Sequence, residues 1–266
     1  LAATEFGIAT CMANAELGFK YGLKGIIPGI ALGGSMLIVG ATGFCIKPLR
    51  NMAVITIPEL LEKKFGKNIR WASGLVIVIG GLLNMGLFLR QAGSFLSITI
   101  GINQGYLELL MTIILIFVGI YTVIGGMISV IVTDYIQFVL MCFGFVTITG
   151  ILIYQFGWFQ IIKGSSNYLG PESLYLNVNY NYGLDRLMLD ILVAFGSVLT
   201  WQTMISRVLA AKDSTIAKKI YMATSPYMLM RFVIPVFLGI SALYYFGPTN
   251  FLGGQEILAM PSMIAQ

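Results

Sequence analysis

The sequence predicts an all-α membrane protein, a polytopic bundle of helices that cross a lipid bilayer. Of the 266 residues, 58% are hydrophobic and only 10% are charged, whereas a soluble domain carries about 25% charged residues. Apolar runs recur along the chain at about the 20 residues that a spanning helix needs. A membrane β-barrel would instead show strands of about ten residues with alternating polarity, and the sequence has long unbroken apolar runs in their place.

Seven apolar segments are predicted to be spans. In chain order they cover residues 1–21, 25–46, 71–99, 106–124, 128–155, 187–206 and 220–246. The first is the least regular, because Glu5 and Glu16 interrupt it, and the second is free of charge and rich in glycine. Glycines within spans predict that neighbouring helices pack closely. The fourth span ends at Gly125 and Gly126, which allow a tight turn before the fifth.

Two loops rich in lysine and arginine determine the predicted orientation. The loop 47–70 carries six of these residues, and the loop 207–219 carries four. Four spans separate the two loops, so both are expected on the same side of the cell membrane, which the positive-inside rule makes the cytoplasmic side. Within the first loop, Thr56 can cap a short helix that has Pro58 in its first turn and Glu59 three residues after the cap.

The sequence lacks the usual signatures of catalysis and of nucleic-acid binding. It contains no histidine, the residue that most often moves protons or binds metals. Its three cysteines, Cys11, Cys45 and Cys142, match no zinc or disulfide spacing. Because no nucleophile lies beside a base and no basic nucleic-acid motif occurs, we predict that the protein is not an enzyme and has no nucleic-acid partner.

Ionisable residues inside predicted spans are functional candidates, because a charge is costly in the bilayer. Asp134, with Thr133 before it, offers oxygen ligands to a hard alkali cation; the alternative is an acid near a helix N-terminus, favoured by the helix dipole. Arg90, in the third span, could clamp a carboxylate with its planar guanidinium. The alternative for Arg90 is an ion pair with a buried acid, of which Glu5 is one.

Two further charges lie at the start of the first span and within the last. Arg231 follows Lys219 by twelve residues, about 18 Å along a helix, which places it near the middle of the membrane. Glu5 is surrounded by small residues and Gly7, so this segment is a poor continuous helix. Broken helices expose backbone carbonyls, from which transporters build ion and solute sites. The alternative is that Glu5 lies in water at the beginning of the chain.

Four stretches of this sequence, in order, resemble the sodium:solute symporter family. They are "AATEFGIAT", "TIPELLEKKFG", "GGMISVIVTDYIQFVLMCFG" and "WQTMISRVLAAKD". The resemblance implies a LeuT-like fold of two inverted repeats of five helices. Residues 1–266 would be a single transmembrane transporter domain, with 1–155 as the first repeat and 186–246 as the start of the second. The chain would be a fragment that covers core helices 1–7, and its ends are expected to be cuts through a longer protein.

The same resemblance implies sodium as the coupling ion. Backbone carbonyls of the family's first core helix bind sodium, and the matching positions here are Ala3 and Phe6. The remaining ligands of that site come from an eighth core helix, which lies outside this sequence. Asp134 matches an acid that is linked to a second sodium site or to the exit path of the ion.

A further set of positions is implied to bind the solute. Glu5 matches an aspartate that proline carriers need for sodium coupling, Arg90 lies near the carboxylate-binding position of sialic acid carriers, and Arg231 matches a substrate-binding lysine of sugar carriers. Ala194 and Ser197 stand where sugar carriers have an asparagine and an aromatic gate, which argues against a sugar. The implied solute-binding residues are Glu5, Thr10, Gly29, Arg90, Ser197 and Arg231.

These features together predict a sodium-coupled symporter that imports a small organic solute across the cell membrane. The two arginines within spans favour an anionic solute that carries a carboxylate. The expected partners are therefore sodium, the solute and the lipid bilayer. The alternative from another class is a transporter-like sensor domain coupled to a signalling partner. A channel would need a continuous polar stripe along several spans, and the sequence has isolated charges instead.

Overall fold

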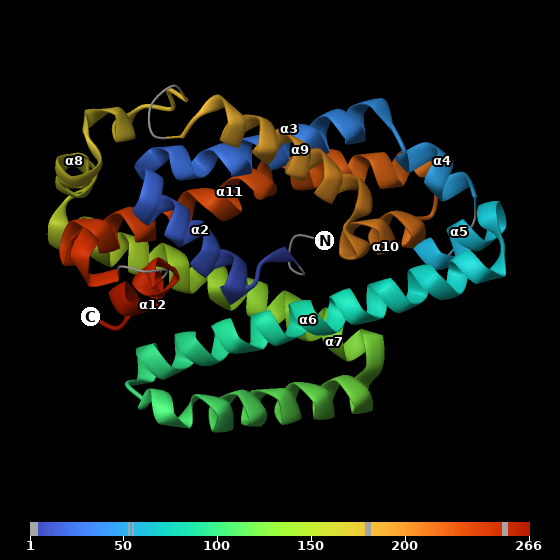
Figure 1. Ribbon diagram of the computed structural model, residues 1–266, viewed down its shortest axis with the longest axis horizontal. Coiled ribbons are helices and arrows are strands. Elements are labelled where there is room, and N and C mark those ends of the chain that lie inside the picture. Colours follow the sequence, from blue (N-terminus) through green and yellow to red (C-terminus); the bar gives the residue numbers. More distant parts are fainter. Residues whose placement is uncertain (1–4, 53, 55, 179–181, 252–254) are drawn as a thin grey trace. The chain divides into compact units, whose positions relative to one another are not determined.

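The computed structural model describes residues 5–52, 54, 56–178, 182–251 and 255–266, and every regular element within them is a helix (Figure 1). The labels follow Figure 1, with α for α-helices and η for 3₁₀ helices. The elements are α2 (Ile8–Tyr21), η1 (Gly22–Ile26), α3 (Ile27–Thr42), α4 (Ile46–Asn51), α5 (Ile57–Phe65), α6 (Lys67–Ile100), η2 (Gln104–Tyr106), α7 (Leu107–Phe156), α8 (Trp158–Leu169), η3 (Pro171–Leu174), α9 (Leu184–Thr200), α10 (Gln202–Ala210), α11 (Ser214–Phe246), η4 (Pro248–Phe251), η5 (Glu256–Leu258) and α12 (Ala259–Ile264).

Six helical stretches of the described chain are long and apolar enough to cross a membrane, which confirms an all-α polytopic membrane protein. The prediction of seven separate spans differs at the beginning of the chain. There the two expected spans form one apolar stretch, in which η1 separates α2 from α3. The 14 residues of α2 extend about 21 Å, less than the roughly 30 Å of hydrocarbon core. The six stretches are Ile8–Thr42, Lys67–Ile100, Leu107–Gly126, Val132–Phe156, Leu184–Ser206 and Ser214–Phe246.

The long helix α7 contains a break at Gly126. The backbone there has φ 58° and ψ −156°, a combination that is open essentially only to glycine. Figure 1 shows the chain turning back at this point, so that α7 consists of two helices that run in opposite directions. The break separates the candidate spans Leu107–Gly126 and Val132–Phe156, and it confirms the turn that the two glycines predicted.

The chain forms two compact units, each built from segments that are distant in sequence. Unit 1 contains residues 1–2, 28–87 and 185–230, and unit 2 contains residues 3–27, 88–184 and 231–266. The core of unit 2 lies around α2, the second half of α11 and α12. Its fully buried side chains include Met12, Leu238 and Met260. At Gly239 a Cβ atom would overlap the carbonyl oxygen of Ala15, so the backbones of α2 and α11 are in direct contact.

Unit 1 brings the two basic loops together. The Thr56 hydroxyl accepts a hydrogen bond from the Glu59 amide at 3.3 Å, which confirms the predicted cap of α5. Arg50 of α4 donates from Nε to the Ala211 carbonyl at 2.6 Å and from Nη2 to the Lys212 carbonyl at 3.2 Å. A small apolar cluster beside them joins Val54, Ile205 and Leu209. The loops 47–70 and 207–219 are thus neighbours within this unit.

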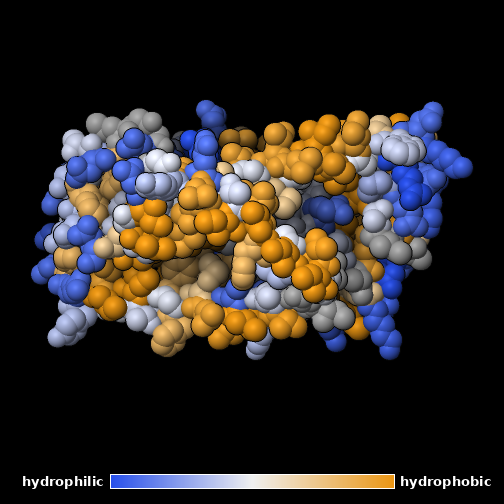
Figure 2. All heavy atoms as spheres, turned by 90° about the horizontal axis from the view of Figure 1, so that it is seen from below, coloured by the Kyte–Doolittle hydropathy of each residue, from blue (hydrophilic) through white to orange (hydrophobic). Residues whose placement is uncertain are grey.

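Several candidate spans leave their apolar side chains uncovered. None of the residues in the most apolar window of α6, or of the first half of α7, is buried. Leu83 is 68% exposed and Val123 is 84% exposed. Much of the surface seen in Figure 2 is accordingly apolar. Such continuous apolar surface is what a helix in contact with lipid presents.

Candidate functional site

Glu5 and Arg231 form a buried ion pair in unit 2. Nη1 of Arg231 lies 3.3 Å from Oε2 of Glu5, and it also donates to the Glu5 carbonyl at 3.2 Å. Only 9% of the Glu5 side chain and 11% of the Arg231 side chain are exposed. Glu5 therefore does not lie in water, and Arg231 holds both its backbone and its carboxylate.

A break in the helix follows Glu5, and a hydrogen bond from α2 reaches the main chain of Arg231. Phe6 and Gly7 are not helical, and Gly7 is extended, with φ −117° and ψ 155°, before α2 begins at Ile8. This confirms the prediction that the first segment is not a continuous helix. On α2, the buried Asn14 donates from Nδ2 to the Arg231 carbonyl at 3.2 Å. The break and α2 are thus both tied to α11 at Arg231.

The predicted sodium residue Phe6 packs against the helix that carries Asp134. The ring of Phe6 makes edge-to-face contacts with Phe138 and Phe145, at centroid distances of 5.9 and 5.5 Å. Phe138 lies one helical turn after Asp134, which is half-buried. The two sodium candidates are therefore on elements that contact each other. The third candidate, Ala3, lies outside the described residues.

The remaining solute candidates are distributed over both units. Thr10 is half-buried on α2, one turn before Asn14 and on the same face. Arg90 is exposed on α6, and among the described residues it has no ion pair. Gly29 is buried in α3 and Ser197 is half-buried in α9, and both belong to unit 1. Of the predicted solute residues, the structure thus joins Glu5 directly to Arg231.

Asn14 is a member of this site that the sequence analysis missed. It is 4% exposed, and its amide bonds the main chain of a residue 217 positions away. The sequence signal for Asn14 is that it is a polar amide within the mainly apolar stretch "CMANAELG". A buried polar group of this kind needs a hydrogen-bond partner. Sequence alone does not identify that partner, which comes from the opposite end of the chain.

The pair is electrically neutral as a unit, which limits what each member can bind. The Arg231 guanidinium lies 5.7 Å from the centre of the Phe232 ring, and its Nε has no hydrogen-bond partner among the described residues. A cation at Glu5 would compete with Arg231, and an anion at Arg231 would compete with Glu5. In the described arrangement the pair ties the broken first segment to α11.

Comparisons with known proteins agree on one family. The sequence model of the sodium:solute symporter family matches residues 1–259. The chain is 29% identical to sodium/glucose cotransporter 1 of Oryctolagus cuniculus over 163 residues, which are 58% of this chain and 24% of that protein. It is 29% identical to sodium/glucose cotransporter 4 of Danio rerio with the same coverage. It is 36% identical to solute carrier family 5 member 4A of Mus musculus over 107 residues, 36% of this chain and 16% of that protein.

These alignments span about a quarter or less of the relatives' own length, 24% for the first and 16% for the last. No solved structure matches the chain. The comparisons therefore identify the family to which the chain is similar. Glucose appears in the names of the relatives and describes those proteins.

Proposed function

The chain belongs to the sodium:solute symporter family, and on this premise we propose that its protein couples inward sodium movement to the import of a small organic solute. The observation that carries the proposal is the family match, which covers residues 1–259. The family is one of transporters, in agreement with the prediction that the chain is not an enzyme. In the part of the chain that the structure describes, six apolar helical stretches supply the integral membrane scaffold that such a carrier requires.

For the coupling ion, we propose that sodium binds near the break in the first segment. Ala3 and Phe6 would contribute backbone carbonyls and Asp134 a carboxylate, since oxygen ligands suit a hard cation. The non-helical backbone at Phe6 and Gly7 supports this assignment, because unwound residues turn carbonyls away from the helix ladder. The contact of Phe6 with Phe138, one turn from Asp134, supports a common location.

For the solute, we propose an organic anion bound through its carboxylate. Arg231 is neutralised by Glu5 at 3.3 Å, so the cation available to the solute is Arg90, which has no acidic partner in the described part of the chain. Several relatives are named for glucose, but this chain has the small residues Ala194 and Ser197 where the resemblance places the polar and aromatic groups of sugar carriers. As the resemblance implies, we further propose a part in solute binding for Thr10 of unit 2 and for Gly29 and Ser197 of unit 1.

For orientation, we propose that the loops 47–70 and 207–219 face the cytoplasm at the cell membrane. Both are rich in lysine and arginine, as the positive-inside rule requires. The hydrogen bonds from Arg50 to the carbonyls of Ala211 and Lys212 support a location of both loops on one side.

Uptake into proteoliposomes tests this function. The full-length protein should take up a radiolabelled organic acid when sodium is higher outside, and replacement of sodium by potassium should abolish the uptake. Arg90→Ala should lower uptake of the acid about ten- to a hundredfold, since a hydrogen-bonded charge contributes about 1.5–3 kcal/mol. Gln91→Ala, at the neighbouring half-buried position, is the control and should transport normally.

Two results would count against separate parts of the proposal. Uptake that is indifferent to sodium would exclude the coupling. Normal uptake of the acid by Arg90→Ala, together with preferred uptake of glucose, would exclude Arg90 as the carboxylate site and leave sodium coupling intact.

A further inference from the structure

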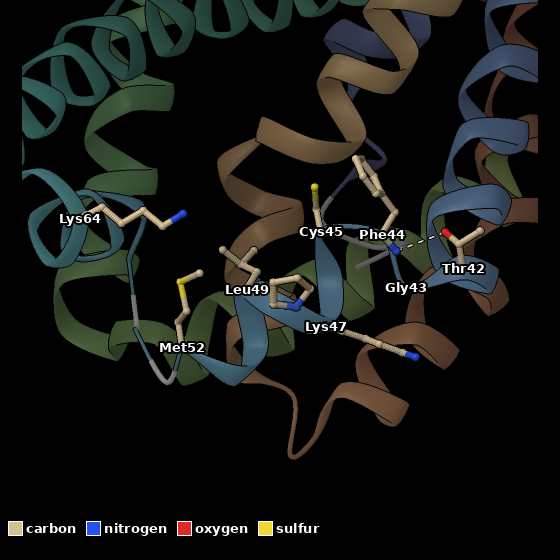
Figure 3. Close-up of a pocket in the computed structure, with 9 residues that line it drawn as sticks. Thr42, Gly43, Phe44, Cys45, Lys47, Leu49, Met52 and Lys64 are labelled. Atoms are coloured by element: carbon tan, nitrogen blue, oxygen red, sulfur yellow. Dashed lines mark hydrogen bonds between the residues drawn. The ribbon is translucent and has the colours of Figure 1, made fainter.

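A pocket of about 620 Å³ lies in unit 1, beside the short helix α4. Most of its lining is apolar and includes Phe44, Leu49 and Met52. Two lysines complete the lining: Lys47, from the first turn of α4, and Lys64, from the last turn of α5. Figure 3 shows Lys64 extending from α5 toward Leu49 and Met52, and Lys47 extending from α4 away from Lys64. The pocket therefore combines an apolar surface with the ammonium group of Lys64, and Lys47 adds a second positive charge beside it.

These two lysines differ from the other basic groups of the same loop. Arg50 donates to two carbonyls of the neighbouring loop, Lys63 donates to the Met52 carbonyl at 3.1 Å, and Arg70 is paired with Glu62. Lys47 and Lys64 are exposed, and within the described ranges neither has an acidic partner. The pocket and its immediate surroundings thus carry two positive charges that have no acidic partner among the described residues.

The position of the pocket in the chain places it at the level of lipid headgroups. Its first lining residue, Thr42, is the last residue of the candidate span Ile8–Thr42. The next candidate span begins at Lys67, directly after α5. The helices α4 and α5 therefore connect two membrane-spanning stretches at one interface. Phe44, the second residue after the span, is 61% exposed, which suits contact with an acyl chain.

We propose that this pocket binds an anionic phospholipid of the adjacent leaflet. Lys64, which extends toward Leu49 and Met52, would hold the phosphate as a point charge, and the nearby charge of Lys47 would add to the attraction for an anionic leaflet. Phe44, Leu49 and Met52 would cover the first part of the acyl chain. A soluble anion would use the positive charge but would leave this apolar surface exposed to water. The assignment concerns the boundary between protein and membrane, and it does not depend on which solute is transported.

The thiol of Cys45 provides a local measurement, because it lines the pocket and is exposed. We would reconstitute the full-length protein in phosphatidylcholine nanodiscs, with and without phosphatidylglycerol, and follow maleimide labelling of the Cys45 peptide by mass spectrometry. Phosphatidylglycerol should slow the labelling several-fold. Labelling of the Cys45 peptide after unfolding in denaturant is the reference and should proceed at the same rate for both lipids, whereas Cys142 lies within the candidate span Val132–Phe156 and should react little in either.

A pair of double variants separates the pocket from general charge. Lys47→Gln with Lys64→Gln should weaken phosphatidylglycerol retention, counted by native mass spectrometry, about ten- to thirtyfold, and should abolish the protection of Cys45. Lys67→Gln with Lys219→Gln removes the same charge from exposed positions outside the pocket and should retain both. All four positions are exposed, so folding is expected to be unchanged, which circular dichroism checks.

Three outcomes would overturn the proposal. Equal loss of lipid in both double variants would show a diffuse charge effect. Equal protection of Cys45 by pure phosphatidylcholine would show that the lysines do not select anionic lipid. Protection of Cys45 by inorganic phosphate alone, in phosphatidylcholine, would identify a soluble anion as the occupant. None of these measurements requires transport, so a failure here is distinct from a failure of sodium-coupled uptake.

Discussion

Replacing Glu5 with glutamine should destabilise the protein by about 3–5 kcal/mol, the usual cost of removing one partner of a buried ion pair. Arg231 would remain almost buried without a compensating charge, since 11% of its side chain is exposed. Thermal unfolding of the full-length protein in nanodiscs measures the effect as a marked fall in the melting temperature.

The matched control for this variant is Glu16→Gln. It also removes an acid that pairs with a base, Lys20, but 26% of the Glu16 side chain and 35% of the Lys20 side chain are exposed. Loss of so exposed a pair should cost less than about 1 kcal/mol. The double variant Glu5→Gln with Arg231→Met should recover part of the stability, because no buried charge is then left alone. Equal effects of Glu5→Gln and Glu16→Gln would contradict the buried pair.

Replacing Gly239 with alanine should cost about 3 kcal/mol, at the upper end of the range for added volume in a packed core. The new methyl group would overlap the carbonyl oxygen of Ala15, and a backbone atom cannot rotate away as a flexible side chain can. The helices α2 and α11 must therefore separate. Because Asn14 and Arg231 meet across the same pair of helices, transport should fall together with stability.

Gly144→Ala provides the comparison for Gly239. Gly144 also lies within a helix of unit 2, but a Cβ atom there would meet nothing within 4 Å. Alanine is the better helix former by about 1 kcal/mol, so this variant should be neutral or slightly stabilising. If both glycine variants unfold at the same temperature, the close contact between α2 and α11 at Gly239 does not contribute to stability as we predict.

The class of the fold and most of its spans could be predicted because they depend on local properties. The length of an apolar run, its lack of charge and a turn at glycine can each be recognised within a single segment of the sequence. Gly126 adopts the backbone conformation that the glycine pair suggested. The irregular first segment was also visible, because Glu5 and Gly7 interrupt an apolar run. The boundary between the first two spans was less accurate, since α2 and α3 are separated only by η1 within one apolar stretch.

The partners within the site could not be predicted, because they are set by packing between distant segments. The sequence indicated that a charge in a span needs an acid nearby, and Glu5 was weighed as the partner of Arg90. The structure pairs Glu5 with Arg231, 226 residues away, and leaves Arg90 exposed. The role of Asn14 has the same origin. The sequence shows that a buried polar or charged side chain needs a partner. Which residue becomes that partner depends on how the segments around α2 and α11 pack together.

Sodium coupling itself is tested most directly by the reverse experiment. Proteoliposomes that contain the full-length protein would receive equal sodium on both sides and an inward gradient of the transported organic acid. Because coupling between two ligands is reciprocal, the acid gradient should drive accumulation of radioactive sodium, and Arg90→Ala should lower the rate of accumulation as much as it lowers uptake of the acid. Sodium movement that is unaffected by the acid gradient would contradict symport, even if the acid itself crosses the membrane.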